Sequence, residues 1–238
     1  MTEARDRLIV ALDVPTATEA RQIIQSLAGT VTTYKIGKQL FTAEGPALLR
    51  EIVDQGYKVF LDLKFHDIPN TVAGAVVAAA KLGVRMLTVH ASGGKHMLTA
   101  AAEAAAKSDS KPLVLAVTVL TSLGDRDLQE IGVSGRVVDQ VLRLAALAKN
   151  SGCGGVVASA LEARQIRAEL GSGFAIVTPG VRPSGGDAGD QARVATPSAA
   201  IAAGASHIVV GRPITAAPDR AAAARAILQE ISGVKIAR

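Results

Sequence analysis

The segment LDLKFHDIPNTV, residues 61–72, brings oppositely charged side chains together at the end of an apolar run. Because neighbouring side chains of a strand point to opposite faces, Asp62 and Lys64 share one face, and Leu61 and Leu63 share the other. If the leucines pack against helices, the charged pair faces an open cavity. An ammonium group fixed beside a carboxylate can stabilise negative charge on a substrate and supply a proton. The alternative is an internal ion pair, although burying such a pair often costs more free energy than the attraction returns.

Two more charged residues end apolar runs earlier in the chain. Asp13 shares a strand face with Ala11, and Lys35 shares one with Thr33. Together with Asp62 and Lys64 they form a candidate array of alternating acids and bases. An internal ion-pair network is again the alternative interpretation.

A divalent metal ion could bind the carboxylates of Asp13, Asp62 and Asp67. The two lysines would compete for the same carboxylates, and alternating lysines and aspartates neutralise one another without a cation. His66 and His90 do not fall at the spacing of zinc ligands, and we interpret His66 as a hydrogen-bonding loop residue. We therefore expect no metal ion.

The ends of the last two apolar runs carry the residue types of a phosphate site. Two glycines let backbone N–H groups approach an anion closely, and two arginines add guanidinium groups that suit phosphate oxygens; these residues are Gly180, Gly211, Arg182 and Arg212. The alternative is that both glycines only form turns. Between the two ends lies SGGDAGDQAR, residues 184–193, which we expect to form a mobile lid from which Gln191 reaches the anion.

Short apolar runs alternate along the chain with alanine-rich segments of helical period, and these elements must position the polar residues. Eight strands are predicted, at residues 7–14, 31–37, 57–65, 84–91, 112–120, 154–159, 174–180 and 207–213. Eight helices are predicted at residues 16–28, 38–55, 70–82, 95–107, 134–150, 161–170, 194–203 and 218–232. Near-continuous apolar strands are typical of a parallel sheet buried on both faces.

Eight strand–helix units in strict alternation predict a (β/α)8 barrel, the α/β fold in which active groups lie at the carboxyl ends of the strands. The rival is an open doubly wound sheet, which usually carries a glycine fingerprint after its first strand, whereas ALDVPTATEA stands at that point here. No linker or shift in composition divides the chain. Residues 1–238 are therefore predicted to form one catalytic barrel domain.

The composition narrows the possible partners and the compartment. Hydrophobic residues make up 49% of the chain and charged residues 20%, which is typical of a globular protein. The single cysteine, Cys153, excludes an intrachain disulfide, and a cytoplasmic location is expected. The net charge of +5 would suit nucleic acid, but the chain has no tryptophan and few aromatic residues for base stacking. A small anionic substrate, or simply a basic surface, is expected instead. Charged residues interrupt every apolar run, so neither a membrane span nor a secretory signal is expected.

The chain resembles the orotidine 5′-monophosphate decarboxylase family over essentially its whole length. The similar segments, which occur in the family's order, are ALDVP, YKIG, DLKFHDIPNTV, VLTS, PGVRP and VVGRPI. The D-x-K-x-x-D-I-P-N-T string within them is highly specific. The resemblance implies a barrel enzyme that converts orotidine 5′-monophosphate (OMP) to UMP and CO2 in de novo pyrimidine biosynthesis, without a cofactor.

The same resemblance implies catalytic and interface roles for residues of the second and third strands and of the segment after the third. Lys64 resembles the lysine that protonates the carbon that loses CO2, and Lys35, Asp62 and Asp67 resemble the other members of the charged array. The family's corresponding segment enters the neighbouring subunit's site, which implies a homodimer with shared sites; the residues that resemble this segment are Asp67, Ile68 and Thr71.

Substrate contacts are also implied by the resemblance. The residues similar to the family's contacts are Asp13 and Lys35 for the ribose, Thr121 and Ser122 for the pyrimidine, and Arg182, Gln191, Gly211 and Arg212 for the phosphate.

Three other functions remain open at this point. Hexulose-phosphate synthases resemble this chain in their own D-x-K-x-x-D strand, but they use a magnesium-stabilised enediolate and a glutamate on the second strand, where this chain has Lys35. Ribulose-phosphate epimerases need metal-binding histidines at strand ends, and only His90 is placed to serve. A ligand-binding barrel without catalysis is the third alternative, and measured turnover distinguishes it from an enzyme.

Overall fold

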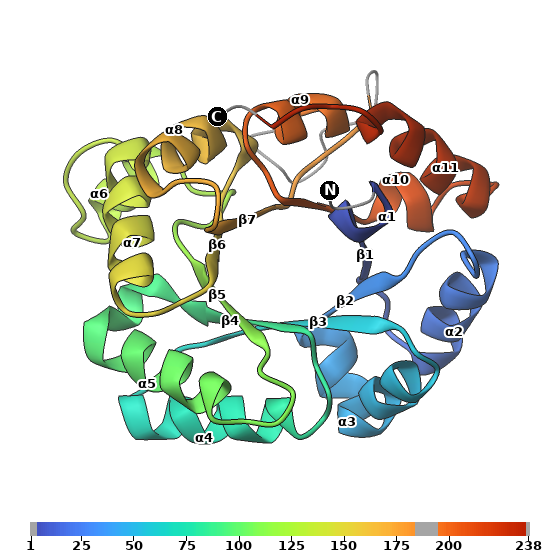
Figure 1. Cartoon of the computed structure of the whole chain (residues 1–238), viewed down its shortest axis with the longest axis horizontal. Helices are drawn as coiled ribbons and strands as arrows, with labels where there is room; N and C mark the ends of the chain where they lie inside the picture. The colour runs from blue at the N-terminus through green and yellow to red at the C-terminus, as the bar shows by residue number, and fades with distance from the viewer. Residues whose placement is uncertain (1–3, 184–194, 237–238) are drawn as a thin grey trace.

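The computed structural model describes residues 4–183 and 195–236 and shows a closed barrel of parallel strands in sequential order (Figure 1). Parallel pairing continues around the ring, and the last strand pairs with the first. The prediction of a (β/α)8 barrel is therefore confirmed. The strands are β1 (Leu8–Leu12), β2 (Thr33–Gly37), β3 (Lys58–Phe65), β4 (Met86–His90), β5 (Leu113–Val117), β6 (Gly155–Val157), β7 (Ala175–Thr178) and β8 (His207–Val210).

The helices form an outer ring around the strands (Figure 1). The predicted helices are present with small shifts at their ends, as α2 (Ala17–Ser26), α3 (Lys38–Asp54), α4 (Pro69–Ala80), α5 (Gly94–Ala106), α7 (Val137–Asn150), α8 (Ala160–Leu170), α9 (Pro197–Ala202) and α11 (Arg220–Ile231). Four short helical segments were not predicted, namely α1 (Ala4–Arg7), η1 (Ala91–Gly93), α6 (Asp125–Glu130) and α10 (Arg212–Thr215). Each spans at most six residues, which is too short for a periodic apolar pattern to develop.

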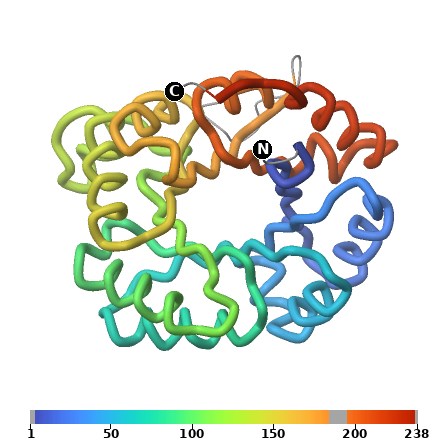
Figure 2. The backbone as a smooth tube through the Cα atoms, viewed as in Figure 1, coloured from blue at the N-terminus to red at the C-terminus, as the bar shows by residue number. Residues whose placement is uncertain are grey.

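Two apolar cores hold the barrel together. The smaller one fills the barrel interior with alternate strand residues, such as Ile9, Phe60 and Val209. The larger one lies between the strands and the helices. The backbone trace in Figure 2 follows the chain once around the barrel, so the N-terminal and C-terminal units lie side by side, with β1 paired to β8.

The third strand departs from regular alternation at the residues that carry the charges. Leu61 pairs with Leu87 and Phe65 with Val89, so residues 62–64 lie opposite a single residue of β4. Lys64 has a φ of 54°, in the left-handed region. Asp62 and Lys64 both line the barrel mouth, as predicted, but an irregular backbone contributes to this arrangement, and the expected period-two strand is wrong here.

Within the described residues, no helix has both the length and the apolar character that crossing a bilayer requires. The assignment of all of residues 1–238 to one domain stays a prediction.

Candidate active site

A cavity of about 510 Å³ opens at the carboxyl ends of the barrel strands. It is lined both by polar groups and by apolar residues from the top of the interior core. The predicted site residues that line it come from β2, β3 and the segments that follow β1, β5, β7 and β8; they are Asp13, Lys35, Asp62, Lys64, Thr121, Ser122, Gly180, Arg182, Gly211 and Arg212. Ten predicted residues that are scattered along the chain thus meet at one cavity.

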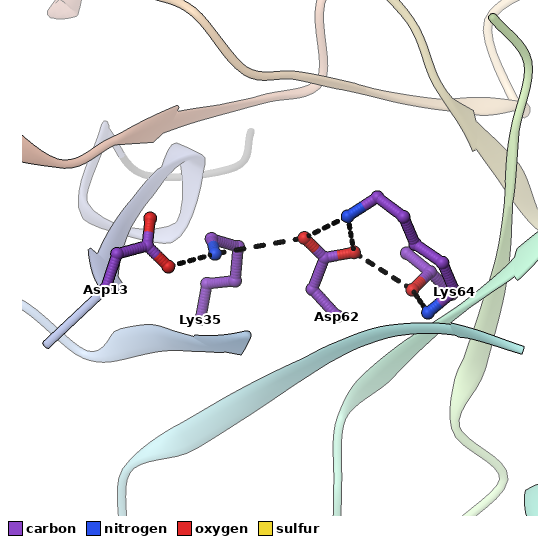
Figure 3. A network of polar contacts seen from close by, with 5 residues as sticks. Asp13, Lys35, Asp62 and Lys64 are labelled. Carbon is purple, nitrogen blue, oxygen red and sulfur yellow. Dashed lines mark hydrogen bonds and ion pairs between the residues drawn. The ribbon is translucent and has the colours of Figure 1, made fainter. Parts of the chain in front are cut away.

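Four of these residues form a continuous line of alternating charge (Figure 3). Lys35 Nζ donates a hydrogen bond to Asp13 Oδ1 at 2.7 Å and lies 3.8 Å from Asp62 Oδ2. Lys64 Nζ donates to both carboxylate oxygens of Asp62, each at 2.9 Å. Asp62 therefore lies between two ammonium groups, as expected for an array that neutralises itself.

The inner members of the array are largely withdrawn from water. The exposed fraction of the side chain is 11% for Lys35, 14% for Asp62 and 23% for Lys64, against 60% for Asp13. Burial by itself raises the pKa of Asp62, but the charges of Lys64 and Lys35 and the hydrogen bonds from Lys64 and Thr88 lower it further than burial raises it. The net pKa lies below the ordinary aspartate value, so Asp62 is an anion at neutral pH.

Gly37 has no side chain, and this makes room for the Asp13–Lys35 ion pair. A β-carbon added there would lie 3.1 Å from both Asp13 Oδ1 and Lys35 Nζ, which is tighter than ordinary van der Waals contact. The residue ends β2 directly before α3. A side chain at this position would press on the charged array.

The predicted phosphate residues follow β7 and β8 and line the same cavity. Gly180 adopts a φ of 74°, which favours glycine, and Arg182 follows it with 9% exposure. Arg182 Nη1 donates to Val181 O at 3.0 Å, which helps to fix the guanidinium group. Gly211 precedes α10, which begins with Arg212. Gln191 and the predicted lid at residues 184–193 lie outside the described residues.

The segment after β3 does not line the cavity of its own chain. Asp67, Ile68 and Thr71 are exposed, and Ile68 keeps 68% of its surface accessible. Asp67 Oδ1 accepts a hydrogen bond from the Ile68 N–H at 2.6 Å. The single chain therefore does not bring these three predicted residues into its own site.

The two histidines near the site form a ring pair. The ring centroids of His66 and His90 are 5.5 Å apart. Burial lowers the pKa of His90, and the nearby His66 and Lys64 lower it further. Among the side chains that the structure describes, no group of three or more His, Cys, Asp or Glu is placed to hold a metal ion.

Sequence reasoning missed two polar residues of the site region. Thr215 lines the cavity and lies three residues after Arg212 on α10, a helical spacing that could have indicated a shared face. Thr88 bonds to the charged array from β4. Its two-residue spacing from His90, at the strand end, could have indicated that it faces inward.

Known proteins of one family are similar to this chain over nearly its whole length. Residues 6–227 match the model of the orotidine 5′-phosphate decarboxylase / HUMPS family. An orotidine 5′-phosphate decarboxylase of Moorella thermoacetica is 54% identical over 238 residues, covering 98% of this chain and 94% of the relative. One of Halorhodospira halophila is 56% identical over 226 residues, covering 95% and 96%. The crystal structure of orotidine 5′-phosphate decarboxylase from Lactobacillus acidophilus superposes with a TM-score of 0.84 at 41% identity, covering 95% of this chain and 99% of that one.

Proposed function

Because the chain belongs to the orotidine 5′-phosphate decarboxylase / HUMPS family, we propose that it converts OMP to UMP and CO2 in de novo pyrimidine biosynthesis. The observation that carries the proposal is the Asp13–Lys35–Asp62–Lys64 array at the cavity. Relatives that are more than half identical over nearly the full chain bear the name of this enzyme, which supports the same activity here.

In the proposed reaction, Lys64 is the proton donor. The bond between carbon 6 and the carboxylate carbon breaks, CO2 leaves, and the electron pair remains on carbon 6. The Lys64 ammonium group then transfers its proton to that carbon, which gives UMP and a neutral lysine. Asp62 and Lys35 hold Lys64 in place before the substrate's charge develops.

Charge stabilisation by one ammonium group is too weak to drive this reaction alone. A pair of unit charges about 4 Å apart is worth roughly 4 kcal/mol at an effective dielectric constant near 20. Several fixed charges must therefore act together in a site that excludes water. The low exposure of Lys35, Asp62 and Lys64 supports this requirement. No cofactor takes part in the proposed scheme.

The substrate's remaining parts have matching groups around the cavity. We propose that Asp13 and Lys35 contact the ribose hydroxyls and that Thr121 and Ser122 contact the pyrimidine. The phosphate lies at the far side of the cavity in this proposal, where its contacts are Arg182, Gly211, Arg212 and, from outside the described residues, Gln191. Phosphate binding far from the reacting carbon can supply the free energy for closing the site.

We further propose a homodimer in which Asp67, Ile68 and Thr71 complete the partner's site. All three are exposed and lie away from their own cavity, which supports a role outside the chain. The exposed Ile68 is an apolar residue directly beside the carboxylate that would enter the partner. A cytoplasmic location stays a prediction.

The family name also covers a sugar-phosphate chemistry, and the second strand argues against it. An enediolate mechanism of that kind needs a metal ion and an acidic ligand, whereas β2 presents Lys35 to the cavity. An ammonium group there repels a divalent cation.

Turnover in the presence of EDTA tests the proposal directly. We expect purified protein to convert OMP to UMP, followed by the change in ultraviolet absorbance, at the same rate with and without the chelator. A protein that shows no conversion, or that converts OMP only after magnesium is added, would overturn the proposed function. Hexulose-phosphate synthase substrates with magnesium provide the comparison assay.

A further inference from the structure

The reacting lysine has an unusual backbone conformation. Lys64 has a φ of 54°, and only one other described residue besides glycines, Lys111, has a positive φ. A side chain in the left-handed region strains the backbone, so neighbouring contacts must hold it there. The strain coincides with the irregular pairing of β3, where residues 62–64 lie opposite Thr88 alone.

Thr88 is fully buried, and its hydroxyl group bridges both sides of this irregularity. The hydroxyl accepts a hydrogen bond from the Lys64 backbone N–H at 2.8 Å and donates one to Asp62 Oδ1 at 3.0 Å. A hydroxyl group has one proton to donate. Thr88 donates that proton in the hydrogen bond to Asp62, and its oxygen accepts the bond from the Lys64 N–H through a lone pair. The side chain thus provides the acceptor that the bulged strand does not find in the regular ladder.

The oxygen of Asp62 that accepts the hydrogen bond from Thr88, Oδ1, also accepts one from Lys64 Nζ at 2.9 Å. Thr88 therefore constrains the reacting lysine twice, once through its backbone and once through its carboxylate partner. Without the hydroxyl, the Lys64 N–H loses its acceptor, and the strand can relax toward ordinary extended geometry, which redirects the side chain.

We infer that Thr88 is a positioning residue for the decarboxylation, and that its hydroxyl group holds Lys64 and Asp62 in the reactive arrangement. This inference rests on the proposed function for its catalytic consequence. Thr88 does not line the cavity, so it acts through the two residues that do.

The test is a set of substitutions that separate the hydroxyl from the shape of the side chain. Thr88→Val keeps the shape and removes the hydroxyl, whereas Thr88→Ser keeps the hydroxyl. Thr178→Val is the matched control, because Thr178 is also a fully buried strand threonine and its hydroxyl has no hydrogen-bond partner among the described residues. The measurements are kcat and KM for OMP, the Kd of UMP and the pH dependence of kcat.

For Thr88→Val we expect kcat to fall by roughly 10- to 100-fold, with the Kd of UMP unchanged within about threefold, because the hydrogen bonds to the Asp62 carboxylate and from the Lys64 backbone N–H are lost while the cavity remains. Thr88→Ser and Thr178→Val should keep kcat near that of the wild type. The acid limb of the kcat profile should move to higher pH in Thr88→Val, since Asp62 loses a hydrogen-bond donor to its charged form.

A Thr88→Val enzyme with wild-type kcat, or a Thr88→Ser enzyme as impaired as Thr88→Val, would overturn the inference. If Thr88→Val does not fold, the kcat values of Thr88→Ala and Thr88→Ser are compared instead, because the two side chains differ only by the hydroxyl group. The inference then requires a lower kcat in Thr88→Ala. A wild-type protein without decarboxylase activity defeats the proposed function instead. In that case crystal structures still test the positioning itself, through the φ of Lys64, which should leave the positive region in Thr88→Val.

Discussion

The ammonium group of Lys64 lies 2.9 Å from both carboxylate oxygens of Asp62. This pair places the proposed proton donor and a fixed negative charge at the same point of the cavity. A substrate carboxylate that approaches Lys64 therefore also approaches Asp62. In the proposed reaction, CO2 leaves next to this pair, and Lys64 then transfers a proton to the carbon that remains.

Replacing Lys64 by alanine removes the proposed proton donor and leaves most of the ligand contacts in place. We expect Lys64→Ala to bind UMP with a Kd within about tenfold of the wild type, and to lose decarboxylation by at least several orders of magnitude, because both the proton and one of the preorganised charges are gone. Calorimetry measures the UMP affinity, and absorbance measures turnover. An alanine variant with near wild-type rate would remove Lys64 from the mechanism.

Mixing two inactive variants tests whether Asp67 acts in the partner's site. Lys64→Ala and Asp67→Ala chains that exchange subunits form hybrid dimers in which one of the two sites has both residues. Random exchange of equal amounts makes half of the dimers hybrids, so about one quarter of the sites should recover. Mixing Lys64→Ala with Asp62→Ala is the control without recovery, since both residues belong to one chain's cavity. Absence of recovery despite demonstrated exchange would count against a shared site.

Gly37→Ala should disturb the charged array without disturbing the barrel. The added methyl group would lie 3.1 Å from Lys35 Nζ and from Asp13 Oδ1, so the ion pair has to shift by a few tenths of an ångström. We expect kcat/KM for OMP to fall by roughly tenfold, since misplacing a positioned group lowers the rate steeply. Gly173→Ala, with open space around the added atom, is the matched control. Equal kinetics in the two variants would show that the array tolerates the shift.

Arg212→Ala should weaken binding of the phosphate selectively. Loss of a charge-assisted hydrogen bond raises KM for OMP by roughly 10- to 100-fold, whereas turnover of orotidine, which lacks the phosphate, should change little. Arg225→Ala, on the exposed surface of α11, controls for the loss of a positive charge. If both substrates were affected equally, Arg212 would not be a phosphate contact.

The sequence predicts the barrel and much of the site because both depend on simple repeats. Polar residues such as Asp13 and Lys35 end apolar runs, and in a parallel barrel all such ends meet at one mouth. The irregular backbone at Lys64 could not be predicted, because it depends on the pairing of β3 with β4 and on the side chain of Thr88. The proposed role of Asp67 in a neighbouring chain does not follow from the sequence pattern either, since contact with another chain would leave no periodic pattern along this one.

His207, at the start of β8, makes the stability of the fold depend on pH. Burial lowers the pKa of this imidazole to about 4, although Asp6 opposes the shift, and its Nδ1 is enclosed without a partner among the described residues. Above pH 6.5, the ordinary value, the group is neutral in both states and adds no pH dependence. As the pH falls from 6.5 toward 4, the unfolded chain binds a proton that the folded chain does not, and the free energy of unfolding decreases by about 1.4 kcal/mol per pH unit.

Urea unfolding of the wild type and of His207→Gln between pH 7 and pH 4 measures this contribution. The difference in free energy of unfolding between the two proteins should change by roughly 3 kcal/mol over that range, because glutamine cannot take up the proton. His96→Gln, on the exposed surface of α5, controls for the loss of an imidazole. Parallel pH curves for the wild type and His207→Gln would contradict the lowered pKa, and would mean that the lower end of the barrel accepts the charge through water or through Asp6.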